Sequence, residues 1–427
     1  MSYFALPVLS YNNNVHTLLE IDFCTQNEIK PIINKTLSLY LSNVKSSIDS
    51  RQLEWDKYKK YTNTYEYIHT VIPGTKYSVC KMKPLSRAFF KMIEISRSIG
   101  LVEGLDLPIK SFHLAEGPGG FIEALSFIRE NELDNYYGMI LVDDYNNSIP
   151  GWKKSKTFLD KTKNVFIETG KTKTGDLMSP ANLRDIYDKH NKSCMIVTGD
   201  GGFDFSSDFE NQEAISSNLI LCQIAFAIAC QAKGGSFVLK MFDTFTSSSV
   251  DMLYLMSVIY DEVTICKPQS SRTANSEKYI VCKGFRMDDT RNLVITLFHI
   301  MKKISDKKCI NRVLSIDIPY AFSTKVEEIN AILGQQQIEC ITQTIALIKS
   351  KNIEKIENLK KINIQKCTSW CQKQRLAYNN SYTCNKILTV KQNRFTYEKS
   401  VTYEKSVTYE NFKNNYEEAS QISCETT

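Results

Sequence analysis

The chain has 427 residues, of which 42% are apolar and 23% are charged, and its formal net charge is +6. This composition is typical of a globular protein of two or three domains and excludes a collagen, a wholly disordered chain and a membrane protein. The longest nearly continuous apolar run, residues 219–230, falls short of the ~20 residues that a membrane-spanning helix needs, so we interpret it as a core helix.

Residues 1–14 show no positively charged segment followed by an apolar one, so we expect no secretory signal and a cytoplasmic location. In a reducing compartment the 13 cysteines, scattered singly through apolar stretches, are expected to be core residues and not disulfides. Residues 1–75 are polar and helix-prone, and we interpret them as a helical N-terminal extension.

Between residues 111 and 285, short apolar runs alternate with longer amphipathic or apolar segments, which is typical of an α/β domain, and we assign this domain to residues 76–300. The predicted strands are residues 111–115, 137–142, 164–168, 194–198, 236–241, 262–266 and 278–282. The predicted helices are residues 120–129, 181–190, 213–232 and 248–260. This order predicts a doubly wound, Rossmann-like sheet of seven strands that binds its ligand at the carboxyl ends. The last strand should be antiparallel, because the loop before it is too short for a parallel crossover.

Residues 301–394 are interpreted as a basic helical region, with helices at 324–333 and 340–362. Residues 341–394 contain 11 basic and 2 acidic residues, interleaved with Trp370, Tyr378 and Tyr382. Such a stretch can bind phosphates and stack on bases, although a solvated helix face explains the charge equally well. Residues 395–427 carry a repeated Thr-Tyr-Glu-Lys-Ser-Val hexapeptide, which predicts a disordered tail.

The first predicted strand of the α/β region leads into Glu116-Gly-Pro-Gly-Gly120-Phe121 and then directly into a helix. Glycines let a ligand approach the backbone beside a helix N-terminus, although tight turns also use glycine for purely steric reasons. The dinucleotide fingerprint and the P-loop are both absent, which argues against NAD and ATP and favours another nucleoside cofactor.

Aspartates follow three further predicted strands of this region, and each is also an ordinary turn residue. They are Asp143, Asp144, Asp176 and Asp200. Their recurrence after successive strands indicates a site that accepts hydrogen bonds from ribose hydroxyls and an adenine amino group.

The chain resembles the FtsJ-like, or RrmJ-type, 2'-O-ribose methyltransferases, whose diagnostic feature is a Lys-Asp-Lys-Glu tetrad. The segment Ser-Arg-Ala-Phe-Phe-Lys at 86–91 matches the first lysine segment, and Gly-Asp-Gly-Gly at 199–202 matches the aspartate. Lys240 and Glu277 follow at intervals of 40 and 37 residues. The resemblance implies that Lys91, Asp200, Lys240 and Glu277 are catalytic.

The resemblance also implies a set of residues that bind S-adenosylmethionine. They are Glu116, Gly117, Gly119, Gly120, Phe121, Asp143, Asp144, Asp176 and Asp200. We expect Lys240, beside Lys91, to take the proton of the ribose hydroxyl, and Asp200 and Glu277 to orient the lysines. The alternative for each tetrad member is a surface ion pair.

Two segments, Glu116 to Phe121 and Asp200 to Phe205, resemble the branch of the family that methylates mRNA caps. The whole chain is also similar to methyltransferases of large cytoplasmic DNA viruses of the asfarvirus type, for which the location would be the host cytoplasm and the virion. The expected partners are the capped 5' end of mRNA and other capping or transcription components, with no membrane. A ribosomal or transfer RNA methyltransferase and a non-catalytic RNA-binding scaffold remain alternatives.

No metal is expected in the site. Cys367, Cys371 and Cys384 offer three thiols, and no histidine follows His299. A closed zinc site would therefore need Cys340 or Cys424 as its fourth ligand.

Overall fold

The computed structural model describes residues 1–11, 14–25, 28–142, 151–202, 211–304 and 308–379. Residues 1–382 form one compact unit. The boundaries predicted near residues 75, 300 and 394 stay predictions, and the predicted tail lies outside the described residues.

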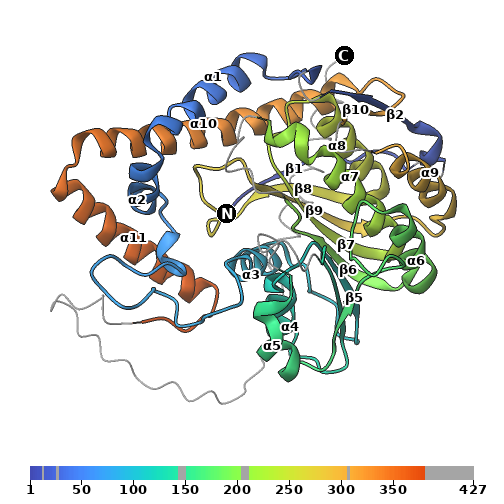
Figure 1. Ribbon diagram of the computed structural model, residues 1–427, viewed down its shortest axis with the longest axis horizontal. Helices are drawn as coiled ribbons and strands as arrows, with labels where there is room; N and C mark the ends of the chain where they lie inside the picture. Colours follow the sequence, from blue (N-terminus) through green and yellow to red (C-terminus); the bar gives the residue numbers. More distant parts are fainter. Residues whose placement is uncertain (12–13, 26–27, 143–150, 203–210, 305–307, 380–427) are drawn as a thin grey trace, which may run out of the picture. The chain divides into compact units, whose positions relative to one another are not determined.

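An eight-stranded sheet forms the centre of this unit (Figure 1). Its strand order is β1 (Ser2–Ala5), β8 (Tyr260–Lys267), β9 (Lys278–Phe285), β7 (Gln231–Met241), β6 (Cys194–Gly199), β3 (Lys110–Leu114), β4 (Asn135–Met139) and β5 (Val165–Glu168). Strands β7, β6, β3, β4 and β5 are parallel to their neighbours in this series, whereas β9 is antiparallel to both β7 and β8. The predicted Rossmann-like fold and the antiparallel last strand are thus confirmed, but the sheet has eight strands and not the predicted seven, because β1 adds to its edge.

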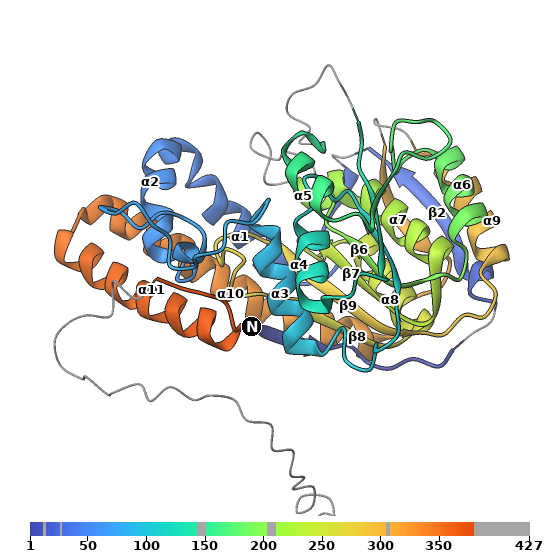
Figure 2. The same ribbon diagram turned by 90° about the horizontal axis from the view of Figure 1, so that it is seen from below.

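Helices cover both faces of the sheet, because residues along each central strand point alternately to opposite sides. In β7, Val238 packs with α3 (Ala88–Ile99) and α4 (Gly120–Arg129), whereas Phe237 and Leu239 pack with α7 (Gln212–Cys230) and α8 (Ser247–Ile259). The two helical layers are visible on either side of the strands in Figure 2. The remaining helices of this region are α5 (Lys156–Lys161), α6 (Pro180–His190) and α9 (Arg291–Met301).

The prediction that residues 1–75 form a helical extension is wrong in part, because this segment also contains two strands. Strand β1 pairs with the edge strand β8, and β2 (Leu19–Cys24) pairs with β10 (Cys309–Leu314) in a separate two-stranded sheet. The partner of β2 is almost 300 residues away along the chain. Pairing over such a distance leaves no local pattern in a strand of four to six residues, so these strands were missed.

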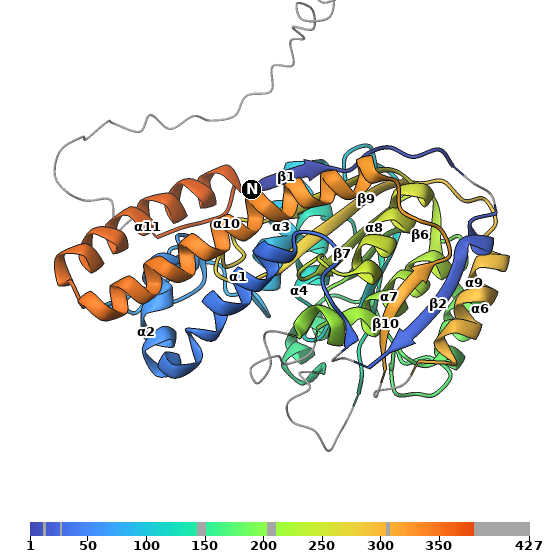
Figure 3. The ribbon, with the colours of Figure 1, turned by 90° about the horizontal axis from the view of Figure 1, so that it is seen from above.

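The C-terminal helices differ from the predicted ones. One helix, α10 (Tyr320–Ser350), runs through the expected break at 334–339, and α11 (Ile353–Lys373) starts after Lys351 adopts a left-handed backbone conformation. Gly334 lies inside α10. A Cβ at this position would lie 3.1 Å from the Leu37 side chain, so the glycine permits close packing with α1 (Lys35–Ser46). Figure 3 shows α10 and α11 beside α1 and α2 (Gln52–Thr62).

Helix α7 is, within the described ranges, the one helix long and apolar enough to cross a membrane, but 89% of its most apolar stretch is buried inside the fold. It therefore has the environment of a core helix. The cysteines at described positions are all free, and all but Cys24 are buried, in agreement with the interpretation of cysteines as core residues.

Candidate active site

The four tetrad residues come from four separate parts of the fold. Lys91 lies in the first turn of α3, Asp200 follows β6, Lys240 lies near the end of β7, and Glu277 immediately precedes β9. Strands β6 and β7 are parallel, so their carboxyl ends lie at the same edge of the sheet. Because β9 is antiparallel to β7, its first residues also reach that edge.

Lys91 and Glu277 form a buried ion pair in which the Lys91 Nζ lies 2.8 Å from both carboxylate oxygens. Burial lowers the pKa of Lys91, and the negative charge of Glu277 opposes this effect. Burial alone would raise the pKa of Glu277, but the cations of Lys91, Lys240 and Lys267 outweigh it and hold this pKa below its usual value. Glu277 is therefore an anion at neutral pH.

Lys240 and Asp200 form the second pair. The Lys240 Nζ donates to the backbone oxygen of Asp200 at 2.6 Å and lies 3.3 Å from its Oδ1 atom. A Cβ on Gly202 would lie 3.3 Å from this Nζ, so the glycine keeps the surroundings of the lysine open. Gln223 of α7 supports the same loop by accepting the Gly201 N–H at 2.9 Å.

Tyr279 joins the two ion pairs and was missed in the sequence. Its hydroxyl accepts a hydrogen bond from Lys91 Nζ at 3.3 Å and donates one to Asp200 Oδ1 at 2.9 Å. Burial, followed by the charges of Asp200 and Glu277, raises the pKa of Tyr279 well above 10, so the hydroxyl remains a donor. The available signal was its position two residues after Glu277, where it pairs directly with Lys240 across the sheet.

The loop of residues 268–277 is fixed by a second buried carboxylate, also missed in the sequence. Glu94, one turn after Lys91, accepts hydrogen bonds from the N–H groups of Gln269 and Ser270 at 2.8 and 3.0 Å. It also accepts the indole N–H of Trp370, from α11, at 3.1 Å. The next residue in the loop, Ser271, donates to Glu277 Oε1 at 2.6 Å. Helix α11 is thereby connected to the Glu277 side of the tetrad.

The glycine turn lies beside the tetrad. Gly119 has a φ of 105°, which favours glycine, and a Cβ on Gly120 would lie 2.2 Å from the Ser86 hydroxyl at the start of α3. A Cβ on Gly117 would lie 2.3 Å from the Ile140 side chain, so these glycines first of all permit close packing. The ring of Phe121 is fully buried with its centroid 6.0 Å from that of Tyr279.

Glu116 caps the helix that follows this turn. Its Oε1 atom accepts the N–H groups of Phe121 at 2.6 Å and Ile122 at 3.0 Å. Burial raises the pKa of Glu116 well above its usual value, and the N–H of Ile122 opposes the shift. In this arrangement the side chains of Glu116 and Phe121 are used within the protein, and their predicted contacts with a cofactor stay predictions.

The predicted aspartates have different outcomes. Asp143 and Asp144 lie outside the described residues. Asp176 accepts the N–H of Met178 at 2.8 Å and so makes the turn that precedes α6. Of the two aspartates at described positions, Asp200 lies in the tetrad and Asp176 does not.

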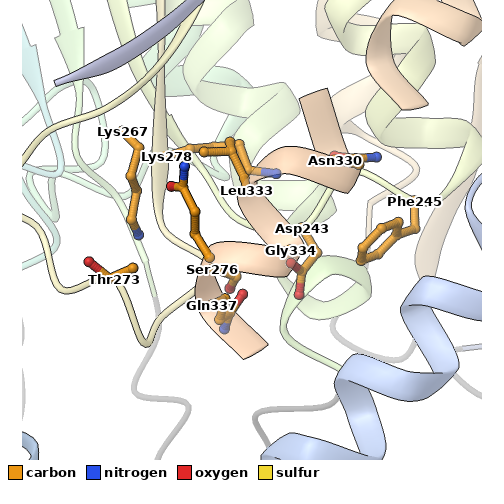
Figure 4. Close-up of a pocket in the computed structure, with 11 residues that line it drawn as sticks. Asp243, Phe245, Lys267, Thr273, Ser276, Lys278, Asn330, Leu333, Gly334 and Gln337 are labelled. Atoms are coloured by element: carbon orange, nitrogen blue, oxygen red, sulfur yellow. The ribbon is translucent and has the colours of Figure 1, made fainter. Parts of the chain in front are cut away.

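A small polar cavity is lined by Ser276 and Lys278, the two chain neighbours of Glu277 (Figure 4). Lys267 and Lys278 line it from β8 and β9, and Asn330 and Gln337 line it from α10. Its volume of about 20 Å³ is enough for about one water molecule. It cannot hold a nucleoside.

No group of three or more His, Cys, Asp or Glu residues is arranged to hold a metal ion within the part of the chain that the structure describes. Cys384 and Cys424, which the zinc alternative would use, lie outside that part.

Residues 84–285 match the model of the FtsJ-like methyltransferase family, and all four tetrad residues fall within this range. The chain contains an FtsJ-like methyltransferase domain. This match agrees with the family that the sequence motifs indicated. The similarity to viral methyltransferases remains untested.

Three relatives of the methyltransferase domain carry names of cap enzymes. Cap-specific mRNA (nucleoside-2'-O-)-methyltransferase 1A of Caenorhabditis briggsae is 30% identical over 59% of this chain and 30% of its own length. A protein named inactive methyltransferase 1B of the same species is 29% identical over 59% and 31%. Methyltransferase 2 of Pongo abelii is 27% identical over 84% and 48%. The chain thus spans about a third to a half of the length of these relatives.

Among solved structures, human methyltransferase-like protein 13 in complex with SAH is 9% identical, with a TM-score of 0.31 over 56% of this chain and 96% of that one. This resemblance does not bear on what the present chain binds.

Proposed function

We propose that the chain is an S-adenosylmethionine-dependent RNA 2'-O-ribose methyltransferase that acts on cap-proximal nucleotides of mRNA. The observation that carries the proposal is the tetrad itself, in which two ion pairs, Lys91–Glu277 and Lys240–Asp200, are joined by one tyrosine hydroxyl. The cap-specific part rests on the names of the relatives.

The glycine turn fits S-adenosylmethionine better than a dinucleotide. A phosphate bound at a helix N-terminus needs free backbone N–H groups, but the N–H groups of Phe121 and Ile122 already donate to Glu116. A nucleoside without phosphate does not require them. The turn lies beside the tetrad through the contact between Phe121 and Tyr279, so a cofactor bound there would place its reactive group near Lys240 and Asp200.

S-adenosylmethionine supplies a methyl group on a positively charged sulfur, which keeps the electron pair when the methyl group leaves. The chain has to bind and deprotonate the ribose hydroxyl. We assign to Lys240 the role of the base that accepts the proton of the ribose hydroxyl. Lys91 is enclosed by Glu277 and Tyr279, whereas Lys240 lies beside Gly202. When Lys240 is neutral and ready to accept the proton, the four tetrad side chains together carry a net charge of −1. This charge complements the positive charge of the sulfonium. Asp200 fixes the position of the Lys240 amine, and Lys91 with Glu277 holds Tyr279 and Asp200 in place.

The helices after residue 320 have a separate proposed role in RNA binding. Exposed lysines on α11 include Lys355, Lys361 and Lys366. They belong to the basic stretch of residues 341–394, whose final part, from residue 380, lies outside the described residues. Their contribution to RNA affinity stays a prediction.

Methyl transfer should be measured on capped, uncapped and ribosomal RNA, followed by digestion to nucleosides. The proposal predicts a methyl group on a ribose oxygen and a marked preference for capped RNA. A preference for ribosomal RNA would support the alternative that the chain is a ribosomal RNA 2'-O-methyltransferase. Absence of transfer with intact RNA binding would support the non-catalytic scaffold, which is a real alternative because one relative is named inactive.

A further inference from the structure

Two arginines flank the Lys91–Glu277 side of the tetrad. Arg87 is the N-cap residue of α3 and lies four residues before Lys91, so the two side chains are on the same face of the helix. Arg272 belongs to the loop of residues 268–277 and directly follows Ser271, the residue that donates to Glu277. The positive charge of Arg87 also lowers the pKa of Lys91, although less than burial does.

Both guanidinium groups lie near a single carboxylate, that of Glu66. Glu66 accepts two hydrogen bonds from Arg272, from Nε at 2.9 Å and from Nη2 at 2.6 Å. The Nη1 atom of Arg87 lies 4.0 Å from Glu66, beyond hydrogen-bond distance, while its Nη2 donates to the Ser270 oxygen at 3.0 Å. One carboxylate therefore serves two cations, and the cluster keeps a charge of +1.

The burial of the three side chains is unequal. The Glu66 side chain is only 3% exposed, whereas those of Arg87 and Arg272 are 27% and 32% exposed. The carboxylate is thus more deeply buried than the two arginine side chains, which are partly exposed. A shallow hollow of only about 10 Å³ lies there, so a ligand would rest on the surface. It is lined by these residues and by polar residues next to Glu66 and Arg272 in the chain. These are Asn63, Thr64, Tyr65, Gln269, Ser270, Ser271 and Thr273.

A purely structural ion pair would need one arginine for this carboxylate. The second arginine, the surplus charge and the partial exposure of both arginine side chains beside the tetrad instead suit an anionic ligand with several oxygens. Guanidinium groups can bind such ligands through two parallel hydrogen bonds. An RNA strand brings phosphodiesters within a few ångströms of every ribose. Protein contacts to these phosphates fix the register of the strand.

We propose that Arg272, held by Glu66, and Arg87, held by the Ser270 oxygen, bind a phosphodiester of the RNA substrate and so set which ribose faces Lys240. This inference rests on the proposed function for the identity of the ligand. It concerns an equilibrium contact, so it can be tested without methyl transfer.

The test is the binding of a short single-stranded RNA oligonucleotide to the full chain at several salt concentrations. The double variant Glu66→Gln/Arg272→Gln leaves the net charge unchanged and allows the two amides to hydrogen-bond in place of the buried ion pair. We expect about tenfold weaker binding and a salt dependence lowered by about 0.7 in log–log slope, the value for one lost phosphate contact. Arg87→Gln, which can still donate to Ser270, should have a similar effect.

The matched control is Lys233→Gln. Lys233 lies at the opposite end of β7 from Lys240 and pairs with Asp288 on the surface, so its loss removes a charge from the chain but no proposed contact. Unchanged affinity and slope in both the double variant and Arg87→Gln, with the fold intact by circular dichroism, would overturn the proposal. So would an equal loss in Lys233→Gln, which would indicate only a general electrostatic field.

Capped and uncapped forms of the same oligonucleotide distinguish two sources of phosphate. Equal losses for both forms assign the contact to the RNA backbone, as proposed. A loss confined to the capped form would assign it to the triphosphate bridge and contradict the backbone contact. If RNA binding responds as expected but no variant or parent methylates RNA, the proposed function fails and the phosphate site stands.

Discussion

The hydroxyl of Tyr279 donates a hydrogen bond to Asp200 Oδ1 at 2.9 Å while accepting one from Lys91. It is the direct connection between the two ion pairs of the tetrad. Tyr279 is also the cross-strand neighbour of Lys240, so one strand pairing, β7 with β9, positions both side chains.

Replacing Tyr279 by phenylalanine should lower kcat by about tenfold, because a hydrogen bond to a charged group contributes about 1.5 kcal/mol or more. The KM for S-adenosylmethionine should change little. Tyr260→Phe is the matched control, since Tyr260 is a buried tyrosine that donates to Gln231 at the start of β7, away from the tetrad. Equal kinetics for Tyr279→Phe and the parent would show that the connection has no catalytic role.

The glycine turn makes a prediction about cofactor affinity. Gly119→Ala forces an alanine into a backbone conformation at φ 105° and places a Cβ 3.3 Å from Leu85, so the turn must move. We expect the Kd for S-adenosylmethionine, measured by calorimetry, to rise by about tenfold. Gly74→Ala is the control, because Gly74 has a φ of 84° but no neighbours within 4 Å of a Cβ. A similar Kd for the two variants would mean that the turn is not the binding site.

Trp370 connects α11 with the loop beside Glu277. Trp370→Phe keeps a ring next to Phe90 but removes the N–H that donates to the buried Glu94. We expect the free energy of unfolding to fall by about 1.5 kcal/mol and kcat by about fivefold. Tyr378→Phe, which loses only an exposed hydrogen bond with Gln372, should resemble the parent in both measurements. Wild-type kcat in Trp370→Phe would disconnect α11 from the site.

The pH dependence of stability should reveal the interaction of the Glu66 carboxylate with Arg272 and Arg87. Burial alone would raise its pKa, but the hydrogen bonds and charge of Arg272, with the charge of Arg87, lower this pKa to about 2 from 4.5. A depressed pKa stabilises the fold above the unfolded value of 4.5, and this stabilisation is lost as the pH falls towards 2. Between about pH 6 and pH 3.5 the parent should lose about 1.4 kcal/mol relative to Glu66→Gln in chemical unfolding. A pH-independent difference would contradict the assigned ionisation.

Local features of the fold could be predicted from the sequence, because each central strand appears as a short apolar run. Lys91, Asp200, Lys240 and Glu277 could be proposed because each lies in a short segment that resembles a motif of the FtsJ-like family. The sheet then brings them together, as the parallel order of β6 and β7 requires.

Residues that depend on distant partners could not be predicted in this way. Glu94 is important because Gln269, Ser270 and Trp370 converge on it, and Glu66 because Arg272 reaches it from more than 200 positions away. The break predicted after residue 333 does not occur, and the packing partner of Gly334, Leu37, lies in another helix. None of these contacts leaves a periodic pattern in the sequence.

The most direct test of the account is the methyl-transfer rate of Lys240→Ala on capped RNA under single-turnover conditions. We expect the rate to fall by about a thousandfold, the usual contribution of a general base, while the Kd for S-adenosylmethionine and the unfolding transition stay close to those of the parent. Lys240→Arg should fail as well, because a guanidinium group does not give up its proton. A Lys240→Ala enzyme with the parental rate, or a product methylated on a base nitrogen, would contradict the assigned chemistry.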